Sequence, residues 1–188
     1  MTSLVTGASG FVGAAVVRAL AAEGERVRAL VRPSSDRRNL DGLRVEIVTG
    51  DITDRASLGA AIRGCRFVFH VAADYRLWVP DPRPMYAANV DGSLNIVELA
   101  AEHGIERLIY TSSVAVLGIH ADRTPADETS PVSIADMIGP YKRSKYIAEE
   151  AVNSRAAELG VGIYAVGALG TTVMRQPFSA RSRSIARF

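Results

Sequence analysis

The chain has 188 residues, of which 48% are hydrophobic and 22% are charged, and its formal net charge is +2. This length suits one domain with a full hydrophobic core, and the composition is that of a globular protein rather than a disordered one. Aromatic residues make up only 6%, and no arginine-rich stripe is interleaved with them, which argues against nucleic acid as a partner.

A single cysteine, Cys65, leaves no partner for an internal disulfide and fits a reducing compartment. The first apolar stretch has no basic segment before it and is interrupted by glycines, unlike a signal peptide. The longest uncharged run, residues 159–174, contains four glycines and is shorter than the ~20 apolar residues of a membrane helix. We therefore expect a cytoplasmic protein without a membrane span.

Strands and helices are expected to alternate along the chain. A short apolar run at residues 3–5 predicts a strand, and residues 11–22 carry apolar side chains at helical spacing. Residues 26–31 alternate between polar and apolar side chains, as a strand does. Further strands are expected at residues 43–48, 67–71, 108–111 and 161–166, and further helices at residues 54–62, 85–103 and 141–159. This pattern predicts an α/β fold, a doubly wound parallel sheet with helices on both faces.

Two segments interrupt this alternation. Residues 118–139 contain two prolines and several Asp and Ser residues, and they predict a long loop of a kind that is often functional. Residues from Thr171 onward show no periodicity. The chain is therefore divided into a domain at residues 1–166 and an irregular tail at residues 167–188.

Three glycines lie where the first predicted strand passes into the first predicted helix. Glycines at this spacing permit a tight turn, close approach of the backbone to a pyrophosphate, and close packing of helix on strand. The helix N-terminus adds free N–H groups and a partial positive charge for the phosphates. The alternative is that the glycines only form a turn. The strand–turn–helix context favours a Rossmann-type, NAD(P)-binding domain at residues 1–166, with a cofactor site at Gly7, Ala8, Ser9, Gly10, Phe11, Val12 and Gly13.

The end of the second predicted strand indicates which nucleotide fits. Sites that select NAD usually have an acidic residue there, which binds the ribose 2′-hydroxyl. This chain has Arg32 instead, followed by Arg37 and Arg38. Because the planar fork of arginine pairs with a 2′-phosphate, we expect NADP, with NAD as the alternative. Arg37 is included in the predicted site, although one of the two later arginines could equally be a solvated loop charge.

Five motifs then occur in a recognisable order: Thr6-Gly-Ala-Ser-Gly-Phe-Val-Gly13, Gly50-Asp51-Ile52, His70-Val-Ala-Ala73, Tyr110-Thr-Ser-Ser113 and Tyr141-Lys-Arg-Ser-Lys145. Over residues 1 to about 160 the chain resembles the extended short-chain dehydrogenases/reductases, the NAD-dependent epimerase/dehydratase superfamily. Residues 70–82 and 137–145 resemble the hopanoid-associated sugar epimerases and the dihydroflavonol 4-reductase-like proteins in particular.

The resemblance implies further contacts with the cofactor. Arg32 would face the adenosine ribose. Asp51 and Ile52 would flank the adenine, after the third strand. Ala72 and Ala73 would line the cofactor on the fourth strand.

The resemblance also places the family's catalytic serine, tyrosine and lysine on Ser113, Tyr141 and Lys145. Tyr141 and Lys145 are spaced i, i+4, which puts them on one face of a helix. A phenol with the reference pKa of about 10 is a poor base near neutral pH, and an ammonium beside it favours the phenolate. Tyr141 would exchange a proton with the substrate during hydride transfer, while Ser113 hydrogen-bonds the substrate oxygen. Tyr141 and Lys145 would also contact the cofactor.

Other residues have less specific signals. Asn89, inside the long helix, predicts a structural hydrogen bond, and the resemblance implies a similar role. Tyr75 and Trp78 could cover a substrate pocket, or pack in the core or in a loop. No metal site is expected, because the three histidines lack the spacing of metal ligands.

After residue 159 the resemblance fails, since the family's Asn-Pro pair beyond the sixth strand is missing. The chain has 20 Arg and only 2 Lys, a usage typical of a GC-rich gene. We hypothesise that a frameshift near residues 160–170 replaced a substrate-binding C-terminal part. The competing interpretation is a natural short variant whose tail is an interaction arm. The apolar surface left uncovered would favour self-association, as a homodimer.

The sequence therefore predicts an NAD(P)-dependent epimerase or reductase that transfers hydride to or from a sugar nucleotide or another carbonyl or hydroxyl compound. Loss of the C-terminal part would impair its activity. The alternative is a non-catalytic NADP-binding module for regulation or protein interaction. An epimerase, a reductase and a dehydratase share the hydride step, so the sequence does not separate them.

Overall fold

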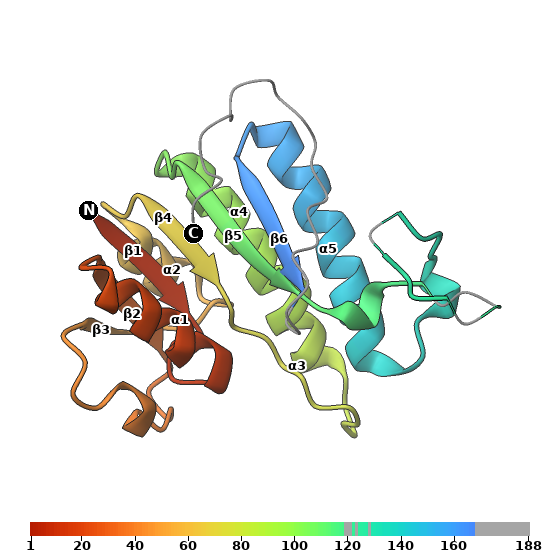
Figure 1. Cartoon of the computed structure of the whole chain (residues 1–188), viewed down its shortest axis with the longest axis horizontal. Coiled ribbons are helices and arrows are strands. Elements are labelled where there is room, and N and C mark those ends of the chain that lie inside the picture. The colour runs from red at the N-terminus through yellow and green to blue at the C-terminus, as the bar shows by residue number, and fades with distance from the viewer. Residues whose placement is uncertain (119–121, 123, 128, 168–188) are drawn as a thin grey trace.

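The computed structural model describes residues 1–118, 122, 124–127 and 129–167. Its centre is a six-stranded parallel sheet in the order β3-β2-β1-β4-β5-β6 (Figure 1). The strands are β1 (Thr2–Thr6), β2 (Arg26–Val31), β3 (Glu46–Thr49), β4 (Phe67–His70), β5 (Arg107–Ser112) and β6 (Ile163–Gly167). This is the strand order of the doubly wound dinucleotide-binding sheet, as predicted. The tail at residues 168–188, to which the frameshift hypothesis refers, lies outside the described residues.

Helices pack on both faces of this sheet (Figure 1). They are α1 (Phe11–Ala22), α2 (Arg55–Ile62), α3 (Arg83–Tyr86), α4 (Gly92–Glu102) and α5 (Gly139–Leu159). Successive strand residues point to opposite faces, so Leu4 packs with α2, α4 and α5, whereas Val5 packs with α1. Within the described residues, the helix covering the second face is α1, which lies on the β1 and β2 side.

The third strand begins later than predicted. β3 covers Glu46–Thr49 rather than residues 43–48. Leu43 and Val45 precede the region paired with β2, and they pack against the core on the α1 side. Alternating apolar residues in a core-facing loop resemble a strand, and periodicity alone does not separate the two.

The helix predicted over residues 85–103 is present but not uniform. It runs from α3 through a π-helical segment, Ala87–Asp91, into α4. Such segments are rare and occur frequently at functional sites. This one contains Asn89, which is buried. Immediately after it, a Cβ on Gly92 would lie 2.8 Å from the side chain of Ile52, so α4 packs closely on the loop after β3.

The longest helix, α5, begins at Gly139, two residues before its predicted start, and has Pro140 in its first turn. It ends at Leu159, and the next residue, Gly160, has a φ of 69°, the left-handed conformation common after helices. The predicted long loop precedes it, with a 3₁₀ turn at Ile134–Asp136. No helix in the described part of the chain is both long enough and apolar enough to cross a membrane.

Candidate active site

The turn between β1 and α1 brings the backbone into close contact with the end of β4. Gly7 has a φ of 64°, and a Cβ there would lie 2.8 Å from the Ala72 backbone. A Cβ on Gly13 would lie 2.0 Å from the Gly7 carbonyl oxygen, which accepts a 3.0 Å hydrogen bond from the Gly10 amide. Ala8 is fully buried beside them. The close approach of turn, helix and β4 therefore requires glycine at the first and third positions.

The N-terminus of α1 follows directly. Gly10 is the N-cap, and no side chain caps the first N–H groups of this helix. Phe11 and Val12 are exposed at this end, Phe11 with 88% of its surface. The carbonyl oxygen of Ser9 accepts a 2.9 Å hydrogen bond from Asn39 Nδ2. Asn39 thus connects the loop after β2 to the turn, a contact that the sequence did not predict.

Thr6, the last residue of β1, holds the segment after β4 in place. Its hydroxyl oxygen accepts hydrogen bonds from two successive amides, the second being that of Ala72, both at 3.1 Å. The same hydroxyl lies 2.8 Å from Nδ1 of His70. Ala72 lies against Gly7, and Ala73 follows it, half-buried. No role was predicted for Thr6, although its place directly before the first glycine was an available signal.

Arg32 directly follows β2, and its side chain is exposed. The pKa of the Asp74 carboxyl lies below its ordinary value, chiefly because Arg76 hydrogen-bonds it and to a smaller extent because Arg32 is nearby. The structure therefore places the Arg32 charge close to the loop after β4, at the carboxyl edge of the sheet.

The two following arginines differ from each other. Arg38 forms an ion pair with Asp36 at 2.5 Å, so its guanidinium already has a partner. Arg37 is exposed, and its Nη2 reaches Thr49 Oγ1 at 3.5 Å, at the end of β3. Of the two arginines, Arg38 therefore fits the solvated loop charge. Contact of Arg37 with a 2′-phosphate stays a prediction.

Asp51 and Ile52 follow β3 at the same edge of the sheet. The Asp51 carboxylate accepts hydrogen bonds from the amide and the hydroxyl of Thr53, at 2.9 and 2.8 Å. Ile52 is buried against Gly92, and its carbonyl oxygen accepts a 3.0 Å hydrogen bond from Asn95 Nδ2. Both residues shape this loop, and their contact with an adenine remains a prediction.

Ser113, Tyr141 and Lys145 come together where β5 ends. Tyr141 Oη donates to Ser113 Oγ at 3.4 Å, and Ser113 Oγ also accepts from the Ala115 amide at 3.1 Å. Lys145 lies one helical turn after Tyr141, with 3% of its surface exposed. Its ammonium donates to the Thr111 carbonyl oxygen at 2.9 Å. The fold thus assembles the three predicted catalytic side chains from two distant segments.

Burial controls the charges around Lys145. It lowers the pKa of Lys145 to about 8, and Glu149 opposes this shift. The Lys145 Nζ also donates to Tyr110 Oη at 3.3 Å, and burial raises the pKa of Tyr110 well above its ordinary value, so this phenol is neutral. Burial, with a smaller effect of Lys145, lowers the pKa of His70 to about 3. Near neutral pH, therefore, the lysine is charged while its aromatic neighbours are not.

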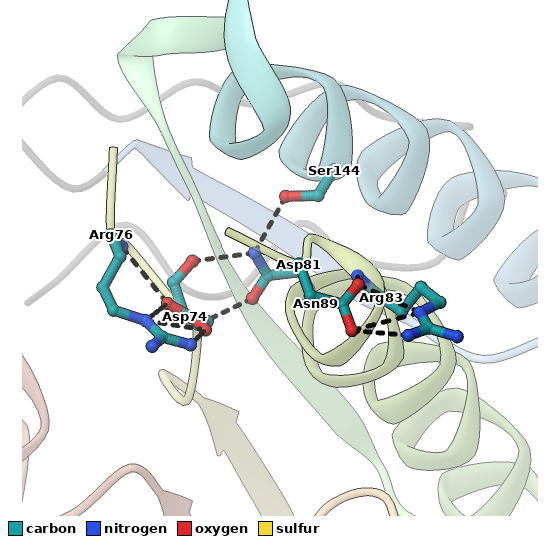
Figure 2. Close-up of polar contacts among 6 residues, drawn as sticks. All are labelled: Asp74, Arg76, Asp81, Arg83, Asn89 and Ser144. Atoms are coloured by element: carbon teal, nitrogen blue, oxygen red, sulfur yellow. Dashed lines mark hydrogen bonds and ion pairs between the residues drawn. The ribbon is translucent and has the colours of Figure 1, made fainter. Parts of the chain in front are cut away.

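Asn89 connects the loop after β4 to α5 (Figure 2). Its Nδ2 donates to the Asp74 carbonyl oxygen and to Ser144 Oγ, both at 2.9 Å, and its Oδ1 accepts from the Asp74 amide at 2.7 Å. Ser144 Oγ donates in turn to the Tyr141 carbonyl oxygen at 2.8 Å. The structural hydrogen bond predicted for Asn89 is confirmed, and it positions the helix that carries Tyr141.

The aromatic residues after β4 and the histidines were the subject of two further predictions. Tyr75 and Trp78 are each 77% exposed, so the alternative in which they pack in the core is wrong. Among the described residues, no group of three or more His, Cys, Asp or Glu side chains is placed to hold a metal ion. One of the three histidines, His120, lies outside the described residues.

Comparison with known proteins identifies the family of the chain. The model of the NAD dependent epimerase/dehydratase family matches residues 3–173, and so extends beyond the expected limit near residue 160. The "Putative dihydroflavonol 4-reductase" of Synechocystis sp. is 48% identical over 146 residues, which cover 78% of this chain and 42% of that protein.

Solved structures show the same likeness. The crystal structure of gox2253 superposes with a TM-score of 0.84 at 51% identity, over 88% of this chain and 50% of that one. The complex of UDP-glucose 4-epimerase from Thermus thermophilus with NAD has a TM-score of 0.79 at 28% identity, over 89% of this chain and 54% of that one. This chain thus spans about half the length of these relatives. It belongs to the NAD dependent epimerase/dehydratase family.

Proposed function

We propose that this chain carries the cofactor site and the acid–base residues of an NADP-preferring oxidoreductase or epimerase. The observation that carries the proposal is the hydrogen bond from Tyr141 to Ser113, with the Lys145 ammonium buried one helical turn away. Relatives named as a reductase and as an epimerase support hydride chemistry on a carbonyl or hydroxyl group, in a sugar nucleotide or another small molecule.

The turn after β1 fits a nicotinamide dinucleotide. The backbone there approaches β4 more closely than a side chain would allow, and the N-terminus of α1 carries no side-chain cap. Uncapped N–H groups at a helix N-terminus bind phosphate. The pyrophosphate would be held by residues 7–13, and the remainder of the nucleotide would lie along Asp51, Ile52, Ala72 and Ala73. The bound nucleotide would supply the hydride acceptor or donor.

NADP is the preferred nucleotide in this proposal, with NAD as the alternative. Arg32 is exposed at the end of β2, where an NAD-selecting site has a carboxylate. Arg37 lies on the loop that follows and would be the second partner of a 2′-phosphate.

The three catalytic side chains have separate roles. Ser113 donates a hydrogen bond to the substrate oxygen, and its position is fixed by the Ala115 amide. Tyr141 transfers a proton to or from that oxygen at its Oη. Lys145 stays charged near neutral pH and stabilises the ionised form of the phenol.

Cofactor titration tests the proposed preference for NADP. We expect NADPH to bind the purified chain at least about tenfold more tightly than NADH, because a charge-assisted pair with the 2′-phosphate contributes about 1.5–3 kcal/mol. Arg32→Asp should reverse this order. Arg44→Asp, which changes an exposed arginine before β3, is the control and should leave it unchanged. Tighter binding of NADH by the unmodified chain would contradict the preference.

Turnover measurements test the proposed acid–base role of Tyr141. NADPH oxidation would be followed with aromatic and aliphatic ketones, and epimerisation with UDP-glucose. Tyr141→Phe should lower kcat by about 100-fold or more, since general acid–base catalysis contributes that much, while NADPH binding is retained. If the unmodified chain binds NADPH but turns over none of these substrates, the non-catalytic module is the better description.

A further inference from the structure

A buried carboxylate lies on the same face of α5 as the proposed catalytic lysine. Glu149 follows Lys145 by four residues, one helical turn further along α5. Only 3% of Lys145 and 4% of Glu149 are exposed. Ionisable groups are almost never buried to this degree unless they are paired or hydrogen-bonded, because removing a charge from water is costly. Each of these two side chains therefore needs partners inside the protein.

Adjacent residues of β5 hold these two side chains. The Thr111 carbonyl oxygen accepts a 2.9 Å hydrogen bond from Lys145 Nζ. The next residue, Ser112, is itself buried, and its hydroxyl donates to Oε2 of Glu149. A hydroxyl donor stabilises a carboxylate acceptor. Since both partners belong to one strand of the central sheet, the lysine and the glutamate are held in a fixed relation to each other.

The other titratable groups around Lys145 do not supply a negative charge. His70 on β4 is neutral near pH 7, because burial keeps its pKa at about 3. Tyr110 on β5 is neutral because burial raises its pKa above its ordinary value. Tyr141 on α5 is the group that the lysine is proposed to serve. Among the described side chains in this cluster, Glu149 is the acidic one, and it alone opposes the effect of burial on Lys145.

We propose that Glu149 is a positioning residue that acts through Lys145: its buried carboxylate stabilises the ammonium form of the lysine and so maintains the positive charge beside Tyr141. This inference rests on the proposed function, and it deepens that function by naming the group that keeps the lysine charged. A purely structural role, in which Glu149 only connects α5 to Ser112, would not require a negative charge. An amide at this position could accept the same hydrogen bond.

The two lysines of the chain, Lys142 and Lys145, allow a direct measurement. In protein labelled with ¹³C,¹⁵N-lysine, NMR shows two side-chain signals, which Lys142→Arg assigns. In the unmodified chain, Lys145 should titrate with a midpoint of about 8. Glu149→Gln should lower that midpoint by at least about one pH unit, a tenfold change in proton affinity. Glu150→Gln removes a carboxylate from the next, exposed position and should leave the midpoint within about 0.2 unit.

An unchanged Lys145 midpoint in folded Glu149→Gln would overturn the inference, as would a midpoint below 7 in the unmodified chain. If the glutamine variant does not fold, the double variant Ser112→Ala/Glu149→Met provides the same test, because replacing both partners of a buried hydrogen bond by apolar groups leaves no donor or acceptor unsatisfied. Circular dichroism would verify folding before each titration. The measurement uses neither nucleotide nor substrate, so its failure is separable from failure of NADPH binding or of turnover.

Discussion

Gly13 and Gly59 are both helical glycines, yet their surroundings differ. A Cβ on Gly13 would lie 2.0 Å from a backbone oxygen of the preceding turn, which cannot move without moving β1. A Cβ on Gly59 would meet only the end of the Leu99 side chain, at 3.5 Å, an ordinary contact. The same substitution at the two positions therefore separates the effect of the close approach from the effect of glycine in a helix.

We expect Gly13→Ala to reduce the free energy of unfolding by about 1–3 kcal/mol, as overpacking does, and to weaken NADPH binding because the turn is displaced. Gly59→Ala should instead stabilise the chain by about 0.5–1 kcal/mol, since alanine is the better helix former. Urea unfolding measures both changes, and nucleotide titration measures the binding. Equal changes in the two variants would show that the close approach has no energetic consequence.

At the scale of elements, apolar periodicity predicted those helices and strands whose residues contact the core at regular spacing. The helices at residues 11–22 and 54–62 and the strand at residues 26–31 follow their apolar periodicity closely. The start of β3 was missed because loop residues that face the core carry the same alternation as a strand. The π-helical segment was missed because it is associated with Asn89, whose partners lie 15 and 55 residues away in the sequence.

The candidate site likewise contains residues that sequence spacing predicts and contacts that it does not. Gly7, Gly10 and Gly13 could be predicted because their spacing reflects the geometry of a single turn. Grouping Ser113 with Tyr141 required the family resemblance, since 28 residues separate them. A contact made by tertiary packing alone, such as that of Ser112 on β5 with Glu149 on α5, has no local signal in the sequence.

Asn89 supports a prediction at this scale, because it joins three elements. Asn89→Ala leaves the Asp74 amide and carbonyl and the Ser144 hydroxyl without their partner, and we expect a loss of about 2–3 kcal/mol in the free energy of unfolding. Asn95→Ala removes the single side-chain hydrogen bond to the Ile52 carbonyl oxygen and should cost about 1 kcal/mol. Hydrogen exchange at the Asp74 amide should be faster in Asn89→Ala and unchanged in Asn95→Ala, which would locate the lost stability at the Asn89 contacts. Equal losses of unfolding free energy in the two variants would contradict this prediction.

Across the whole molecule, a line of buried hydrogen bonds joins the two halves of the sheet to α4. Thr6 Oγ1 accepts two amide hydrogens, so its own proton is directed to Nδ1 of His70. The Nε2–H of His70 then donates to Ser93 Oγ at 3.0 Å, and Ser93 donates to the Asn89 carbonyl oxygen. A second proton on the imidazole would face the Thr6 hydroxyl without an acceptor, which agrees with the lowered pKa of about 3.

This arrangement makes the stability of the fold depend on pH. In the unfolded chain His70 binds a proton below its ordinary value of 6.5, whereas in the folded chain it stays neutral down to about 3. Protons therefore favour the unfolded state between these limits, and stability falls as the pH is lowered through them. At pH 5 this one group should cost about 2 kcal/mol relative to pH 7, as 1.5 units correspond to about 2 kcal/mol. Urea unfolding at pH 7, 6 and 5 measures the slope.

The matched variants are His70→Gln and His103→Gln. Aspartates with lowered pKa values also make the folded chain less stable in acid, but their contribution is the same in every variant. The difference between the pH slopes of two variants therefore isolates the contribution of His70. His70→Gln should be less stable than the unmodified chain at pH 7, yet its stability should fall less steeply toward pH 5. His103→Gln, near the end of α4, should keep the full slope. If His70→Gln and the unmodified chain lose stability in parallel, burial does not hold the imidazole neutral in the folded chain.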